Sequence, residues 1–249
     1  HLLCFEITET EAIVNLQSAR VFMQTLRDLG CRFSLDDFGS GFASFTYLRR
    51  LPASVLKIDQ SFVRDMLWDS EDLAIVEGVI GLSAAFRRTV IAEGVETAEH
   101  GELLLRLGCN LAQGYGIARP MPAEALPGWV AAWQPDPVWT AYRNLLANRD
   151  DLPLTYAEVD HRNWVKCVEA CLVDGAVEPP PADIIDCRFG NWYQGEGLSR
   201  YGSFPEFSLI GSLHATVHVL GNELVELRMA GRSELARSRL GELHALRDQ

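Results

Sequence analysis

Residues 32–41 read Arg32-Phe-Ser-Leu-Asp-Asp-Phe-Gly-Ser-Gly41, a short apolar run that ends in two aspartates and a glycine-rich turn. Four other runs have a similar form, at residues 3–8, 55–59, 90–95 and 112–118. Amphipathic segments separate them. One has apolar residues every three or four positions from Ile13 to Leu29, and another is bounded by Thr97 and Gly108. Strands that alternate with helices predict an α/β fold with a parallel sheet, either open or closed into a barrel.

Acidic and polar residues recur at the ends of these five runs. They are Glu6, Glu9, Asp36, Asp37, Lys57, Asp59, Glu93, Glu96 and Gln113. Because the carboxyl ends of parallel strands face one way, we expect these side chains to converge. Converging carboxylates repel one another unless a cation lies among them, and Mg²⁺, Mn²⁺ and Ca²⁺ prefer oxygen ligands. Adjacent Asp36 and Asp37 could serve two ions about 3.5–4 Å apart. The alternative is that single residues of this set only cap helices or form turns.

The same runs resemble the motifs of the EAL phosphodiesterases, which hydrolyse cyclic di-GMP. The matching strings are Phe5-Glu-Ile-Thr-Glu9, Asp36-Asp-Phe-Gly-Ser-Gly-Phe42, Leu56-Lys-Ile-Asp59, Ala92-Glu-Gly-Val-Glu-Thr97, and Gln113-Gly-Tyr115 with Arg119-Pro120. The resemblance implies a TIM-like barrel, two Mg²⁺ or Mn²⁺ ions, and hydrolysis of cyclic di-GMP to pGpG. It implies that the metal ligands are Glu6, Asp36, Asp37 and Glu93, that Lys57 orients the catalytic water, and that Gln113 completes the metal and water shell. Glu96 is expected to brace the loop that begins at Asp37.

The family's own Glu-Ala-Leu strand and a following metal-binding Asn are expected upstream of Glu6, and this chain starts at His1 without an initiator Met. The tripeptide Glu124-Ala-Leu126 follows the last motif and is interpreted as a coincidence. We therefore expect the five C-terminal β/α units of the barrel and little hydrolysis by this chain alone. The alternative is an inactive parent domain that only binds cyclic di-GMP.

The alternation of strands and helices stops at Trp133-Gln-Pro-Asp-Pro137. A short helix is expected at 138–148. The next is expected to start at a capping box of Thr155 and Glu158 and to stop at Gly175. A long helix is then predicted from Phe204 to Leu246, interrupted at Gly221 or Gly231. The expected parts are thus an EAL domain at 1–134, a linker at 135–152 and an all-α bundle at 153–249.

Three histidines and one cysteine stand out in this second half: His161, Cys187, His214 and His218. His214 and His218 are four residues apart, so they share one face of a helix. One thiolate and three imidazoles make a complete tetrahedral Zn²⁺ set. The alternative is that they are ordinary core or interface histidines. Cys167 and Cys171 are also four apart, and we interpret them as buried thiols rather than a second site.

The pattern His161-x-x-Trp164, Cys187-x-Phe-Gly-x-Trp-Tyr193 and His214-x-x-x-His218 resembles the chemoreceptor zinc-binding (CZB) domain over about residues 153–230. That resemblance implies a helical bundle, a homodimer, and Zn²⁺ held by these four residues. The whole chain is then expected to be a cyclic di-GMP phosphodiesterase regulated by zinc, with a cyclic di-GMP receptor or a purely structural zinc module as alternatives.

The chain has 249 residues, with 22 basic and 34 acidic side chains, so its formal charge is 22 − 34 = −12. This charge and the lack of a basic block argue against binding a DNA or RNA duplex. No apolar run is long enough to span a bilayer. There is no basic start to suggest a signal peptide, and the six cysteines are scattered, so we expect a cytoplasmic location with reduced thiols.

Overall fold

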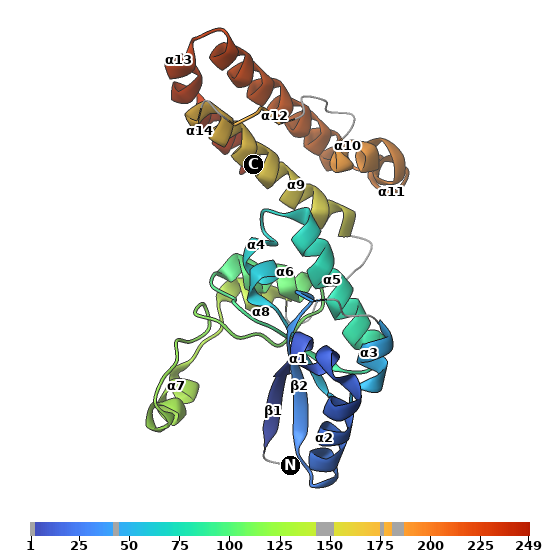
Figure 1. The fold of residues 1–249 in the computed structure, drawn as a ribbon. Coiled ribbons are helices and arrows are strands. Elements are labelled where there is room, and N and C mark those ends of the chain that lie inside the picture. Colours follow the sequence, from blue (N-terminus) through green and yellow to red (C-terminus); the bar gives the residue numbers. More distant parts are fainter. Residues whose placement is uncertain (1–2, 42–44, 143–151, 175–176, 181–186) are drawn as a thin grey trace. The chain divides into compact units, whose positions relative to one another are not determined.

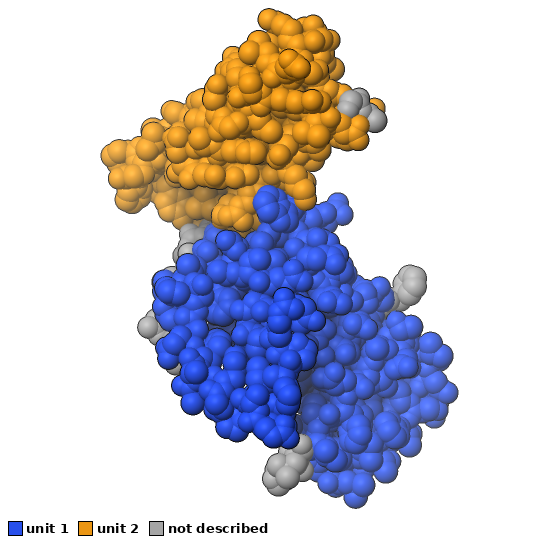
Figure 2. Space-filling view, turned by 90° about the vertical axis from the view of Figure 1, so that its left-hand side faces the viewer, with its two compact units in different colours: residues 1–149 blue, residues 150–249 orange. Residues whose placement is uncertain are grey.

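The computed structural model describes residues 3–41, 45–142, 152–174, 177–180 and 187–249. The chain divides into two compact units, at residues 1–149 and 150–249 (Figure 2). Among the described helices, none is both long and apolar enough to cross a membrane.

The first unit contains a four-stranded parallel sheet in the order β1-β2-β3-β4. Figure 1 shows β1 and β2 side by side. The strands are β1 Cys4–Thr8, β2 Arg32–Phe38, β3 Val55–Ile58 and β4 Thr89–Ala92. Helices α1 Glu9–Val14 and α2 Leu16–Asp28 connect β1 to β2, and α3 Phe45–Arg50 precedes β3. Helices α4 Gln60–Asp65 and α5 Ser70–Ala85 connect β3 to β4. Because consecutive parallel strands need a crossover, this connectivity is the β/α alternation that the sequence predicts.

Apolar side chains of β2 and β3 form the centre of the first unit. Phe33, Leu35, Leu56 and Ile58 are at most 1% exposed. Strands buried on both faces are mostly apolar, which explains why the sequence runs are so regular. β1 lies at the edge of the sheet, where Phe5 stacks on Phe33 with ring centroids 5.5 Å apart.

The expected fifth strand at 112–118 is wrong as a strand. It is reduced to one parallel bridge, between Ala112 and Ala92. Gly114 lies so close to the backbone of Val95 that a Cβ would clash, and the chain then turns, with the Ile117 N–H donating to the Gly114 carbonyl at 3.0 Å. The close approach fixes the segment, but the turn ends its pairing with β4.

The rest of the first unit is helical. Helix α6 Ala98–Arg106 follows β4, with a capping box between Thr97 and His100. The 3₁₀ helix η1 Ala123–Ala125 and α7 Leu126–Ala132 come next, so the Glu124-Ala-Leu126 string lies on an exposed helix start. Of the helix expected at 138–148, α8 covers Pro137–Tyr142 and the remainder lies outside the described residues. The Trp139 indole N–H donates to the Ala98 carbonyl at 2.8 Å, which attaches α8 to α6.

The second unit is built on two long neighbouring helices, α9 Leu152–Val173 and α12 Pro205–Met229 (Figure 1). Between these two helices in the sequence come α10 Arg188–Trp192, the π-helical turn η3 Tyr193–Gly197 and α11 Leu198–Tyr201. Helices α13 Ser233–Ser238 and α14 Leu240–Arg247 close the bundle. The core consists of Val165, Val168, Leu172, Val217, Leu220, Leu224, Ala236 and Leu243.

Two expectations about these helices change. α9 begins at Leu152, so Thr155 is a buried residue of its first turns and not its cap, and the expected stop at Gly175 lies outside the described residues. The long helix predicted from Phe204 to Leu246 continues unbroken through Gly221 and is interrupted at Gly231, whose φ is 76°. It is interrupted a second time, which was not predicted, at Arg239 between α13 and α14. Glycine ends a helix where a left-handed conformation is required, and of these two glycines Gly231 has that conformation and Gly221 does not.

Candidate metal centres

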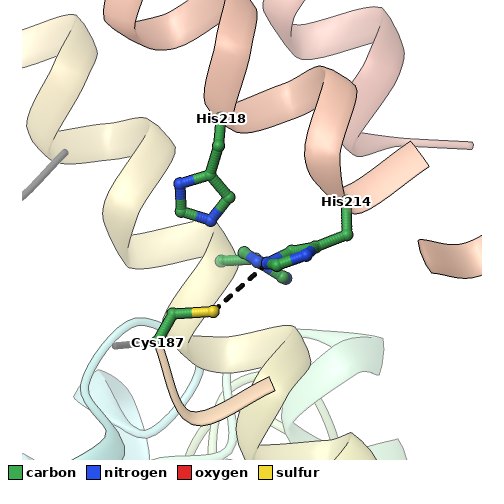
Figure 3. A group of neighbouring side chains, drawn as sticks. Cys187, His214 and His218 are labelled. Atoms are coloured by element: carbon green, nitrogen blue, oxygen red, sulfur yellow. Dashed lines mark hydrogen bonds between the residues drawn. The ribbon is translucent and has the colours of Figure 1, made fainter. Parts of the chain in front are cut away.

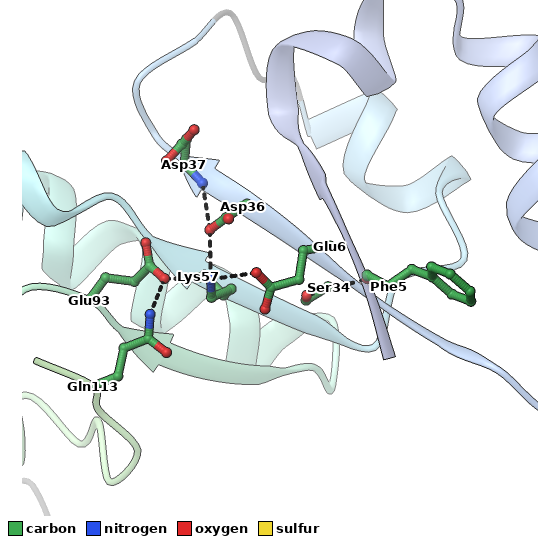
Figure 4. A network of polar contacts seen from close by, with 8 residues as sticks. All are labelled: Phe5, Glu6, Ser34, Asp36, Asp37, Lys57, Glu93 and Gln113. Atoms are coloured by element: carbon green, nitrogen blue, oxygen red, sulfur yellow. Dashed lines mark hydrogen bonds and ion pairs between the residues drawn. The ribbon is translucent and has the colours of Figure 1, made fainter. Parts of the chain in front are cut away.

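The first cluster surrounds the Lys57 ammonium, which β3 holds at the centre of the sheet (Figure 4). The residue is 4% exposed. Its Nζ lies 3.1 Å from Glu6 Oε2, 3.0 Å from Asp36 Oδ1 and 2.5 Å from Glu93 Oε1. Burial alone would lower the lysine pKa, but hydrogen bonds to Glu93, Asp36 and Glu6 outweigh it and raise the pKa above its usual value. Lys57 is therefore a fixed positive charge among carboxylates.

Three of the four predicted carboxylate ligands come together. Oxygen atoms of Asp36, Asp37 and Glu93 lie within 4.8 Å of one another. Glu6 is outside this group, although it reaches the same lysine, and its side chain is 55% exposed. Asp37, the second-last residue of β2, has a φ of 52°, an uncommon value for a residue other than glycine. The pairing of β2 with β3 shifts its register there, between Leu35 and Phe38.

The electrostatics of this group favour a bound cation. Burial and then the negative charges of Asp36 and Asp59 raise the pKa of Asp37. Burial raises the pKa of Glu93, although Lys57 opposes that rise. Carboxylates whose ionised form is disfavoured in this way gain most from a divalent ion, so the oxygens fit Mg²⁺ or Mn²⁺.

The neighbouring residues hold this group in place. The Gln113 side-chain amide donates to Glu93 Oε1 at 2.5 Å. Asp59 accepts from the Ser61 N–H and caps α4, which is the structural role left open for such residues. Glu9 was not singled out for this loop. It is 3% exposed, and its Oε2 accepts from the Gly39 N–H at 3.0 Å, the kind of contact expected of Glu96. The signal available in the sequence was an acidic residue, Glu9, directly after a predicted strand.

The second cluster joins three segments of the second unit. His161 comes from α9, Cys187 is the N-cap of α10, and His214 and His218 come from α12. All four offer ligand atoms within 4.8 Å of one another. Cys187 Sγ lies 3.2 Å from His214 Nε2 (Figure 3). The ring centroids of His161 and His214 are 4.6 Å apart, and those of His214 and His218 are 4.7 Å apart.

These buried rings lack ordinary partners within the described part of the chain. His161 Nε2 and both ring nitrogens of His218 are buried without a hydrogen bond. Such atoms cost free energy unless something satisfies them, and a metal ion does so. Burial lowers the pKa of His161 to about 3 and that of His214 to about 4, with further lowering by neighbouring histidines. The imidazoles are therefore neutral near pH 7, the form that binds metal.

The thiol completes the set. Burial raises the pKa of Cys187, partly offset by the N–H groups of Gly190 and Phe189. The Gly190 N–H lies 3.1 Å from Sγ. One sulfur and three imidazole nitrogens at this spacing fit Zn²⁺. Cys167 and Cys171 belong to neither group of potential ligands, and Cys171 is fully buried with Arg228 Nη1 at 2.6 Å.

A tryptophan that sequence reasoning noted only as part of a motif supports this cluster. The Trp164 ring lies 4.4 Å from the His218 ring, and the backbone of Gly221 leaves the space that the indole fills. A Cβ at Gly221 would clash with the indole. The signal available in the sequence was the glycine in the middle of a long helix, where it has an energetic cost.

The fold and the two clusters define a two-part protein, an acidic α/β domain joined to a helical domain with a histidine–cysteine site. Residues 1–120 match the family model of the EAL domain, and residues 161–225 match that of the chemoreceptor zinc-binding domain. The chain thus carries a partial EAL domain followed by a chemoreceptor zinc-binding domain. The second match includes all four residues of the histidine–cysteine cluster.

Several curated proteins resemble the first unit. The bifunctional diguanylate cyclase/cyclic di-GMP phosphodiesterase MucR of Pseudomonas aeruginosa is 45% identical over 129 residues, which are 52% of this chain and 19% of that protein. Cyclic di-GMP phosphodiesterase PdeB of Shewanella oneidensis is 46% identical over 119 residues, which are 48% of this chain and 14% of that protein. The chain spans about a fifth or less of the length of these relatives. A solved structure, the PaMucR phosphodiesterase in complex with c-di-GMP, is 45% identical, covers 50% of each chain and has a TM-score of 0.49.

Proposed function

We propose that the first unit forms part of a site that hydrolyses cyclic di-GMP to pGpG with two Mg²⁺ or Mn²⁺ ions. The main support is the group of Asp36, Asp37 and Glu93 oxygens beside the Lys57 ammonium. The named activities of the curated relatives support the choice of substrate. Bound ions in such a site supply an activated water and offset the charge of the phosphodiester.

The residues of the chain then have distinct roles. Asp36, Asp37 and Glu93 hold the ions, with Glu6 as a further ligand once it leaves Lys57. Lys57 orients the attacking water and neutralises charge that develops on the phosphate, because its ammonium is fixed by carboxylates on three sides. Gln113 keeps Glu93 oriented through its amide hydrogen bond.

The proposal is tested by measuring release of pGpG from cyclic di-GMP with Mn²⁺. We expect the full-length product of the gene to be active and its Asp36→Asn variant to lose at least about a hundredfold in rate. Asp65→Asn is the matched control, since that residue pairs with Arg64 at the surface and lies outside the metal group. Equal rates for Asp36→Asn and Asp65→Asn would refute the assignment.

We expect residues 1–249 alone to hydrolyse little, because four described strands leave the sheet open and Glu6 is largely exposed. The same features support a second candidate, a receptor that binds cyclic di-GMP without turnover. Calorimetry together with the pGpG assay distinguishes the two. A receptor in the full-length protein shows saturable binding of cyclic di-GMP in the calorimeter but releases no pGpG.

For the second unit we propose a Zn²⁺ site at His161, Cys187, His214 and His218 that regulates the first, with a homodimer as the acting form. The support is the buried, unsatisfied imidazole nitrogens beside a thiol. Hydrolysis should change across buffered free Zn²⁺ in the unaltered protein and stay constant in Cys187→Ala. If the rate of hydrolysis does not depend on free Zn²⁺ in either protein, the zinc has a structural role only. Removing it with a chelator would then cause a loss of helix, measured by circular dichroism.

A further inference from the structure

The second unit contains a cavity of about 520 Å³ beside the histidine–cysteine cluster. Its walls come from α9, from Phe189 of α10, from α12, and from the end of α14 with the last two residues of the chain. Leu154 and Ala157 of α9 face Ile210 and Leu213 of α12 across it. Water occupies about 30 Å³ per molecule, so the space is large enough for a hydrated metal ion.

The cavity reaches the cluster from one side. His161 and His214 line it, whereas Cys187 and His218 do not. His218 is 1% exposed and is covered by the Trp164 ring at 4.4 Å. The Trp164 ring in turn packs against the apolar core that includes Val165 and Leu220. Two of the four ligands therefore border this cavity, and His218 is closed off by packed side chains. Cys187 is partly exposed but does not line the cavity.

We propose that this cavity is the passage by which zinc enters and leaves the site, so that the metal exchanges without unfolding of the bundle. The inference rests on the proposed zinc binding. An ion held deep in a packed helical core is released only when the core opens, and interiors of that kind contain few voids. A preformed cavity that ends on two ligands removes that requirement. It would let zinc occupancy follow the free zinc concentration, which regulation requires.

The mouth of the cavity carries both charges. Glu158 and Asp248 lie on its wall with Arg162 and Arg247. Arg162 Nη2 pairs with Glu158 at 2.6 Å, and Arg247 Nε pairs with Asp248 at 2.7 Å. Each guanidinium therefore already has a carboxylate partner, so an approaching Zn²⁺ meets a compensated surface. This leaves side-chain size, rather than charge, as the property that controls passage.

The test compares two substitutions one residue apart on α12. Ile210 lines the cavity and is 43% exposed, whereas Leu209 is 60% exposed and lies outside the lining. Zinc-loaded residues 1–249 are mixed with excess chelator, and loss of zinc is followed by stopped flow. We expect Ile210→Trp to slow release by about tenfold, a barrier increase of about 1.4 kcal/mol. Leu209→Trp should leave the rate unchanged.

A second variant covers the case in which Ile210→Trp does not fold. Leu213→Ala widens the cavity, so release should become faster while equilibrium zinc affinity stays within about twofold. Unchanged rates in folded Ile210→Trp or in Leu213→Ala would overturn the proposal and direct attention to the side of Cys187. An equal slowing in Leu209→Trp would also overturn it. Equilibrium titration of the unaltered chain is done first, and a lack of zinc binding there would refute the proposed function itself.

Discussion

Acidification should destabilise the metal-free second unit, because its histidines are buried in the neutral form. The pKa is about 3 for His161 and about 4 for His214, against about 6.5 in an unfolded chain. The unfolded state therefore binds more protons between these values, and stability is lost as the pH falls below about 6.5. From about pH 7.5 to pH 5, each residue accounts for about 2 kcal/mol, so the pair accounts for about 4 kcal/mol.

This loss is a large fraction of the stability of a typical domain, which is about 5–15 kcal/mol. Hydrogen exchange of α12 amides in residues 1–249, measured with a chelator at both pH values, gives the free energy of opening directly. In His161→Phe the pH-dependent loss should fall by about 2 kcal/mol, the share of this one group. Burial also lowers the pKa of His218, so His214 and His218 account for the loss that remains. Saturating zinc should move the loss to lower pH, because bound imidazoles resist protonation. An opening free energy that is the same at both pH values in the metal-free chain would refute the reasoning.

Three further outcomes are expected. Lys57→Met leaves the surrounding carboxylates without their cation, so the free energy of unfolding of the first unit should fall by about 3 kcal/mol and recover in part with Mn²⁺. Thermal melting with and without the ion measures this. An unchanged melting temperature in the absence of Mn²⁺ would contradict it. Gly221→Ala forces a Cβ against Trp164 and should cost about 1–3 kcal/mol in a denaturant titration, whereas Gly241→Ala, which meets no neighbour, should cost nothing. Thr97→Ala removes a helix cap and should lower stability by about 1 kcal/mol, which protection of α6 amides would report.

The sequence predicts the first four strands because each is a short apolar run buried between helices. β2 matches its expected range, Arg32–Phe38. The run at 112–118 contains two glycines and fails as a strand, since Gly114 and Gly116 bring the backbone against residues 95–97. Such close approach depends on the three-dimensional position of another segment. The local sequence pattern therefore predicts that an ordered segment occurs at 112–118, whereas tertiary contacts determine that it is not a strand.

The candidate sites show a similar division. The spacing of His214 and His218 follows from helix geometry and could be read directly. The positions of His161 and Cys187 beside them depend on how α9 and α10 pack, which only the family resemblance indicated. At the other site, the order of motifs predicted Asp36 and Asp37, but not that Glu6 would pair with Lys57 outside the carboxylate group. Pairing of flexible side chains is decided by competing contacts that no motif records.

The closeness of the Trp164 ring and the Gly221 backbone also limits how this sequence can change over time. A larger residue at 221 can be accepted only if position 164 shrinks, and a smaller residue at 164 would leave a hole next to His218. The two positions should therefore vary together among descendants of this chain. Descendants that keep tryptophan at position 164 should keep glycine at position 221.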